Sequence, residues 1–188
     1  MRHWLLLLGL LLLTACAQLP TAPASGYALS GRLSIRDGKQ NQQALFGWQT
    51  SAAQDRLSFD SPLGQTLAAL TIQYDSSGYP VSATLEQGGT TPVTASDPQA
   101  LLYQLTGLSL PLGGLRWWLR GEAAPFSPAE RSETDGTVTL RQDGWQIEAR
   151  DFRPLGQHQQ PYRIDARRDD IQLRIVISDA STDLQTTP

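Results

Sequence analysis

The sequence predicts a mainly β fold, an antiparallel sheet of about nine strands with two short helices. Strand-like alternation of apolar and polar residues occurs on both sides of a helix-like stretch near the middle of the chain. Turn dipeptides, above all Asp-Gly, separate the alternating runs. The single cysteine lies in the N-terminal segment, so an apolar core rather than disulfides must stabilise the sheet. These observations favour one domain built on a large antiparallel sheet.

The first 15 residues have the form of a secretory signal peptide. Arg2 precedes an almost pure leucine run over 5–13, interrupted only by Gly9. This run is shorter than the ~20 apolar residues that span a bilayer. Leu13-Thr14-Ala15-Cys16 resembles the lipobox of bacterial lipoproteins. The resemblance implies cleavage before Cys16 and acylation of its thiol, and the alternative is an ordinary secretory signal beside a stray cysteine.

The residues after the cysteine indicate an anchored and exported domain. Residues 16–26 are small, uncharged and Pro-containing, which predicts a lipidated flexible tether. Ala17 stands where an aspartate retains lipoproteins in the inner membrane of many bacteria, so we expect sorting to the outer membrane. Loss of Arg2 with the signal changes the net charge from −3 to −4. A mildly acidic chain without a basic run is a poor binder of nucleic acids.

The first half of the domain, which we expect to span residues 27–179, reads as an antiparallel meander. Residues 28–36 alternate, with Leu29, Leu33 and Ile35 on one face. Asp37-Gly38 then predicts a tight turn. Further strands are predicted over 43–49, 56–59, 66–74 and 81–87.

The middle of the chain favours two helices. Ser96 is the predicted N-cap of the first, with Asp97 and Pro98 in its first turn, and apolar residues follow at helical spacing: Ala100, Leu101, Leu105 and Leu108. The second is predicted over 112–120, with Leu112, Leu115, Trp118 and Leu119 on one face and Arg116 and Arg120 on another side. Residues 121–136 are polar and are predicted to form a loop.

Four more strands are predicted before the C-terminus. Residues 137–142 and 145–150 form a hairpin around Asp143-Gly144. Residues 162–167 and 171–178 form another around Asp169-Asp170, and residues 180–188 read as a polar, frayed tail. A large antiparallel sheet with few helices can curl and leave an apolar hollow, and such barrel-like folds are natural binders of acyl chains.

Catalytic groups are sparse in the mature chain. His158 is its one histidine and lies in a polar stretch, which favours a solvated loop histidine over a metal ligand or a triad base. A pair of carboxylates could still catalyse glycoside hydrolysis. However, Asp135, Asp143, Asp169 and Asp170 occupy predicted turns, where aspartate is common for backbone reasons. No glycine-rich phosphate loop joins a strand to a helix. We therefore expect no enzyme activity, no metal and no cofactor.

Several short motifs occur in one order along the chain. They are Gly31-Arg32-Leu33-Ser34-Ile35, Trp48-Gln49, Ser61-Pro62-Leu63-Gly64-Gln65-Thr66, Leu101-Leu102 to Leu105-Thr106-Gly107, Leu110-Pro111-Leu112, Leu115-Arg116-Trp117-Trp118-Leu119-Arg120-Gly121 and Asp143-Gly144-Trp145-Gln146-Ile147. Together, behind a lipobox, they resemble the LolB family of outer-membrane lipoprotein receptors over about residues 27–177. The sequence differs from the family pattern at Ile177-Ser178-Asp179, which lacks the tryptophan expected near the C-terminus.

The resemblance implies a fold and a role. The fold is a strongly curved, unclosed antiparallel barrel with a helical lid that encloses an apolar cavity. The role is that of a receptor anchored by lipid to the outer membrane and facing the periplasm. It takes client lipoproteins by their acyl chains from a soluble LolA-like carrier, inserts them into the inner leaflet of that membrane, and is expected to act as a monomer. The alternative is a structural or scaffolding outer-membrane lipoprotein that carries no acyl chains.

Two sets of site residues follow. Leu63 occupies the third position of a predicted turn, and the resemblance implies that this leucine inserts client lipoproteins into the membrane. Apolar alternation and the helix faces predict a cavity lining that includes Leu33, Ile35, Trp48, Leu70, Ile72, Leu101, Leu105, Leu115, Trp118 and Trp145.

Overall fold

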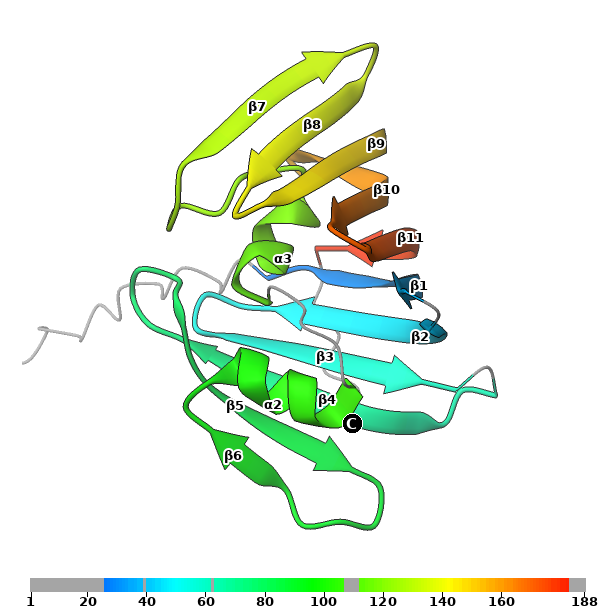
Figure 1. The fold of residues 1–188 in the computed structure, drawn as a ribbon, viewed down its shortest axis with the longest axis vertical. Helices are drawn as coiled ribbons and strands as arrows, with labels where there is room; N and C mark the ends of the chain where they lie inside the picture. The colour runs from blue at the N-terminus through cyan, green and yellow to red at the C-terminus, as the bar shows by residue number, and fades with distance from the viewer. Residues whose placement is uncertain (1–25, 39, 62, 107–111, 183–188) are drawn as a thin grey trace, which may run out of the picture.

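Eleven antiparallel strands form a single sheet in the computed structural model, which describes residues 26–38, 40–61, 63–106 and 112–182 (Figure 1). The strands are β1 (Ala28–Asp37), β2 (Gln40–Thr50), β3 (Gln54–Asp60), β4 (Thr66–Tyr74), β5 (Pro80–Gln87), β6 (Val93–Ala95), β7 (Ala129–Thr134), β8 (Thr137–Gln142), β9 (Trp145–Leu155), β10 (His158–Arg168) and β11 (Ile171–Ser181). Their order in the sheet is β6-β5-β4-β3-β2-β1-β11-β10-β9-β8-β7. Because β6 and β7 are both edges, the curved sheet is not closed.

The chain builds this sheet from two meanders that meet at β1 and β11. Leu33 of β1 pairs with Ile175 of β11, and each strand alternates between the core and solvent. Gly31 permits the close approach of β1 and β11, since a Cβ built at this position would lie 2.1 Å from the carbonyl oxygen of Val176. A strand near the N-terminus and the last strand are therefore neighbours in the middle of the sheet.

Two helices lie on the inner face of the sheet, α2 (Pro98–Thr106) and α3 (Leu112–Trp118) (Figure 1). The prediction of Ser96 as the N-cap is wrong. Asp97 caps α2, because its Oδ1 accepts hydrogen bonds from the backbone N–H groups of Gln99 (2.9 Å) and Ala100 (3.0 Å). The second helix ends two residues earlier than predicted, in a turn that passes through Gly121 at φ 71°.

Two strands were not predicted, β6 and β7. The predicted loop over 121–136 is wrong for residues 129–134, which form β7. All six residues of β7 are exposed, so the strand has no apolar alternation to signal it. It exists because its backbone pairs with β8 through a turn at Asp135 (φ 50°) and Gly136 (φ 71°).

The C-terminal strands are longer than predicted. β9 and β10 continue to Leu155 and from His158, although prolines at 154 and 161 and polar neighbours argue against strand there. β11 runs to Ser181, which pairs with Ala28, so the first two residues of the predicted tail belong to the sheet. In both places backbone pairing with a neighbouring strand outweighs local composition.

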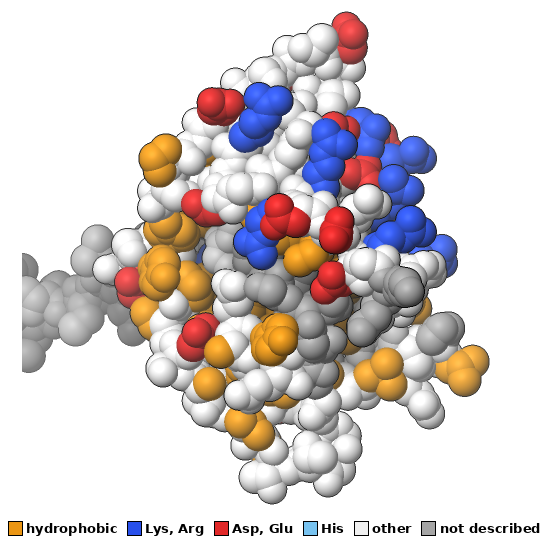
Figure 2. Space-filling view, in the orientation of Figure 1, with side chains coloured by type: hydrophobic (Ala, Val, Ile, Leu, Met, Phe, Trp, Pro, Cys, Tyr) orange, Lys and Arg blue, Asp and Glu red, His pale blue; other side chains and the backbone are white. Residues whose placement is uncertain are grey.

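The two faces of the sheet differ in chemistry. The inner face and the helices form one apolar core with residues from nearly every element. The outer face carries arginines, and Val176 of β11 pairs with Arg32 on one side and with Arg163 on the other. Figure 2 shows the resulting gathering of basic side chains on the side of β9–β11. Asp165 offsets part of this charge by pairing with Arg150 and Arg174.

Candidate functional site

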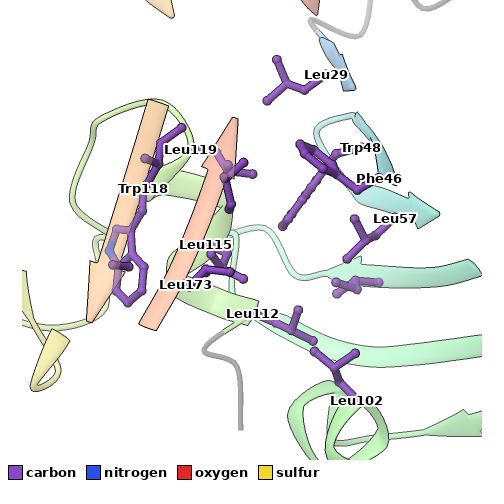
Figure 3. Packing of buried hydrophobic residues seen from close by; sticks show 14 of the residues in the cluster. Leu29, Phe46, Trp48, Leu57, Leu102, Leu112, Leu115, Trp118, Leu119 and Leu173 are labelled. Carbon is purple, nitrogen blue, oxygen red and sulfur yellow. The ribbon is translucent and has the colours of Figure 1, made fainter. Parts of the chain in front are cut away.

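The inner face of the sheet and α3 enclose a cavity with a wholly apolar lining. Nine residues line it: Leu33, Phe46, Trp48, Leu57, Phe59, Leu112, Leu115, Leu173 and Ile175. Leu112 and Leu115 form the roof from α3, and the other seven come from β1, β2, β3 and β11. Figure 3 shows side chains from α3 and from the strands pointing toward a common centre. The cavity measures ≈ 20 Å³, room for about one water molecule.

The structure places the predicted lining residues in two groups. Leu33, Trp48 and Leu115 line the cavity. The second group is buried in the surrounding core without lining it, and comprises Ile35, Leu70, Ile72, Leu101, Trp118 and Trp145. The side chain of Leu105 lies outside the described part of the chain.

Six lining residues were not named from the sequence, namely Phe46, Leu57, Phe59, Leu112, Leu173 and Ile175. A signal for them existed. Leu57 and Phe59 are two residues apart along β3, as are Leu173 and Ile175 along β11. The two side chains of each pair therefore point to the same face of the sheet. Which apolar side of each strand meets α3, however, depends on the curvature of the sheet.

A buried carboxylate holds the last turn of α3 to the edge of the cavity. Asp55 of β3 is fully buried, and its Oδ2 accepts hydrogen bonds from Trp48 Nε1 (3.1 Å) and from the hydroxyl of Tyr74 (2.9 Å). Arg116 of α3 places its Nε 3.8 Å from the same oxygen and donates from Nη2 to the carbonyl of Ser51. Its guanidinium also stacks on the Tyr74 ring, 4.2 Å from the centroid. We call Asp55, Trp48, Tyr74 and Arg116 the Asp55 cluster.

Burial dominates the electrostatics of this cluster. Removal of the carboxylate from water raises the pKa of Asp55 from 3.8 to about 6, although the charge of Arg116 opposes the shift. Burial likewise raises the pKa of Tyr74, and the nearby Asp55 charge adds to that effect. No sequence motif marked Asp55, because an isolated aspartate beside a turn is usually exposed.

A second polar anchor holds the C-terminal end of α3. The amide of Gln142 in β8 accepts from Trp118 Nε1 (2.9 Å) and Ala124 N (2.9 Å), and donates to the carbonyls of Ala124 (2.6 Å) and Ser127 (3.0 Å). Gln160 of β10 donates to the carbonyl of Leu119 (2.7 Å). The predicted apolar face of this helix, which ends on Trp118 and Leu119, is buried as expected.

Leu63 lies at the tip of the loop between β3 and β4, with 89% of its surface exposed. The backbone N–H of Gly64 donates to the carbonyl of Ser61 (2.9 Å), which confirms the predicted turn. Gly64 has φ 79°, a conformation that favours glycine. The loop extends from the same side of the molecule as the turn between β1 and β2 (Figure 1). Leu63 is thus the most exposed large apolar side chain in the described ranges.

Other predicted sites have less structural support. Cys16 and the rest of residues 1–25 lie outside the described residues. His158 is exposed, but as the first residue of β10 rather than in a loop. Within the described ranges, no three or more Asp, Glu, His or Cys side chains gather as metal ligands. No helix there combines the length and hydropathy needed to cross a bilayer.

The architecture defines a class of open β-barrels covered by helices, and solved structures share it. A DUF1329 family protein from Desulfovibrio piger superposes with a TM-score of 0.60 at 8% identity, covering 88% of each chain. A putative outer membrane lipoprotein-sorting protein domain from Vibrio parahaemolyticus gives a TM-score of 0.53 at 9% identity, covering 87% of each chain. At these identities the likeness concerns the fold.

Sequence comparison identifies the family within this class. The family described as "Outer membrane lipoprotein LolB" matches residues 25–179, and the chain belongs to it. The protein "Outer-membrane lipoprotein LolB" of Cupriavidus pinatubonensis is 37% identical over 152 residues, 73% of this chain and 70% of that one. Its namesake in Chromobacterium violaceum is 31% identical over 186 residues, 94% of this chain and 97% of that one.

Proposed function

We propose that this protein is a lipoprotein receptor, anchored in the outer membrane by acylated Cys16 and facing the periplasm. It accepts client lipoproteins from a soluble LolA-like carrier by binding their acyl chains, and it inserts them into the inner leaflet of the outer membrane. Membership of the LolB family supports the localisation role. In this proposal the protein is not an enzyme, because delivery is a sequence of binding equilibria.

The wholly apolar cavity beneath α3 is the observation that carries the proposal. A site for acyl chains needs no polar group in its lining, and burial of a chain is worth ~0.8 kcal/mol per methylene. Transfer runs downhill if this cavity binds acyl chains more tightly than the carrier does and the bilayer binds them more tightly still. Because the cavity measures ≈ 20 Å³, α3 must move away from the strands to admit a chain.

Leu63 acts in the step in which client lipoproteins are inserted into the membrane. An apolar tip that enters the lipid interface brings the protein to the bilayer, at a gain of ~1–3 kcal/mol for one leucine. The side chain is free to do this, since 89% of it is exposed. It acts in release to the membrane and not in uptake, because it lies outside the cavity lining.

A transfer assay tests both parts. The mature chain with Cys16→Ser takes up an acylated fluorophore saturably and then delivers it to liposomes. Leu63→Glu should retain uptake and lose delivery. Val176→Glu is the matched control, because it places the same charge on an exposed apolar residue of the outer face and should deliver normally. Normal delivery by Leu63→Glu would reject the membrane role, and failed uptake would place Leu63 in an earlier step.

The scaffolding alternative has one observation in its favour. A cavity of ≈ 20 Å³ is nearly a filled core. Purification of the Cys16→Ser protein separates the two functions. A co-purified lipopeptide or saturable uptake of the fluorophore supports acyl-chain carriage, whereas the absence of both supports the scaffold.

A further inference from the structure

Helix α3 connects two distant parts of the sheet. On one side Arg116 bonds to Ser51, next to the end of β2, and contacts Asp55 of β3. On the other side Trp118 bonds to Gln142 of β8, and Leu119, just after the helix, bonds to Gln160 of β10. In the strand order β3 and β8 are separated by five strands, β2, β1, β11, β10 and β9. The helix therefore spans the inside of the curve as a brace between the two halves of the open barrel (Figure 1).

The two ends of this brace differ in how well their polar groups are satisfied. At the β8 end, the Gln142 amide uses both acceptor positions and both N–H donors within the core. At the β3 end, Asp55 Oδ1 is buried and accepts no hydrogen bond of normal geometry from the described residues. A neutral, fully bonded amide is stable in a dry core, whereas a partly bonded carboxylate bears a large desolvation cost.

The exposure of the two ends also differs. The side chain of Arg116 retains 16% exposure beside the fully buried Asp55, and it borders a surface hollow of ≈ 430 Å³ that Trp117 and Arg120 also line. When the contact breaks, the guanidinium can turn into this hollow and regain water. Trp118 has no such route, because it is fully buried against Trp145, with 5.9 Å between the ring centroids.

We propose that the contact between Asp55 and Arg116 is the releasable attachment of α3, and that its opening enlarges the cavity while the contact between Trp118 and Gln142 stays in place. This inference rests on the proposed function, since it names the motion that admits an acyl chain. Leu112 and Leu115, the roof of the cavity, lie on the same helix as Arg116 and move with it.

Protonation of Asp55 weakens the releasable contact, because it removes the charge that attracts Arg116 while the carboxyl group stays buried in the sheet against Trp48 and Tyr74. The titratable and charged groups that interact with the carboxylate come from three places: Tyr74 of β4, Arg116 of α3 and Tyr27 before β1. Arg120 and Glu122, which follow α3, interact with Tyr27. Burial raises the pKa values of both tyrosines, so they stay neutral. Between pH 7.5 and 5 the charge of Asp55 changes, since burial raises its pKa to about 6.

Hydrogen exchange of the α3 amides tests the proposal without any ligand. In the mature chain with Cys16→Ser, exchange over residues 112–118 should quicken as the pH falls from 7.5 to 5, after correction for the intrinsic rate. Asp55→Asn keeps acceptors for Trp48 and Tyr74 but removes the charge. It should raise α3 exchange at pH 7.5 by about tenfold, the scale of a charge-assisted contact, and should abolish the pH dependence. Arg116→Gln serves as a second variant if Asp55→Asn does not fold.

Asp165→Asn is the matched control, because it removes an ion-paired carboxylate that lies on the outer face away from α3. It should leave α3 exchange unchanged. Fluorophore uptake by the same proteins gives the second readout, and Asp55→Asn should take up the probe several-fold faster. Unchanged α3 exchange in Asp55→Asn, or slower uptake, overturns the proposal. If the unsubstituted protein binds no probe, the proposed function fails, while the exchange data still decide whether the contact releases α3.

Discussion

The carboxylate of Asp55 and the guanidinium of Arg116 face each other inside the barrel, with 3.8 Å between Oδ2 and Nε. One group belongs to the sheet and the other to the helix that roofs the cavity. Since Asp55 is fully buried, the pair links the protonation state of the protein to the position of its lid.

The contribution of Asp55 to the stability of the protein should fall as the pH rises from about 4 to about 7. Burial raises the pKa of Asp55 from 3.8 to about 6, so the folded chain holds this proton more tightly than the unfolded chain. The stability linked to that proton is complete below about pH 3.8 and is lost as the pH passes the folded value, a change of about 3 kcal/mol. Urea unfolding at several pH values in this range gives the slope of the free energy of unfolding against pH. This slope is compared between the unsubstituted protein and Asp55→Asn. Equal slopes in both proteins would contradict the assignment.

Polar substitutions should distinguish the cavity wall from the core. Leu33 is half-buried and lines the cavity, so Leu33→Gln should weaken fluorophore binding strongly while lowering stability by ~1 kcal/mol. Leu70 is fully buried and does not line it, so Leu70→Gln should lower stability by ~3 kcal/mol or more. Thermal unfolding measures the change in stability of each variant, and equilibrium binding measures the change in its affinity for the fluorophore. If Leu33→Gln loses binding only in proportion to stability, Leu33 is a core residue.

Gly31→Ala should weaken the junction of the two meanders. Its new Cβ would lie 2.1 Å from the carbonyl oxygen of Val176, so β1 and β11 must separate locally, at a cost of ~2–3 kcal/mol. Gly88→Ala is the control, because no heavy atom lies within 4 Å of a Cβ built there, and it should change stability by less than ~0.5 kcal/mol. Denaturant midpoints of both variants check the prediction. A loss in Gly88→Ala equal to that in Gly31→Ala would speak against it.

Ala17 should determine the membrane in which the mature protein resides. Ala17→Asp should move it from the outer to the inner membrane, whereas Ala17→Ser should leave it in the outer one. Separation of the two membranes by density, followed by detection of the protein, measures the distribution. Unsubstituted protein recovered in the inner membrane would show that residue 17 does not act as predicted.

Local features of the sequence were enough to predict most of the fold. Alternation in β1 and β11 follows from the two-residue period of a strand. The turn at Asp143 (φ 51°) and Gly144 (φ 77°) follows from the few residues that accept positive φ. The buried face of α3 follows from the period of a helix. Each of these signals lies within a few neighbouring residues, and the ordered motifs along the chain led to the LolB family.

Other features arise only when distant segments meet. The strand β7 has no apolar face and forms through pairing with β8. The arginine-rich outer face joins Arg32 and Arg163, which are far apart in the chain and become near neighbours across β11. Asp55 reads as an ordinary polar residue until β4 and α3 cover it with Tyr74 and Arg116. The sequence by itself thus determined most of the elements and the family, because periodicity and turn chemistry are local. Only the tertiary structure decided the size of the cavity, its lining and the buried charge beneath its lid, because burial depends on which surfaces the curvature of the sheet brings together.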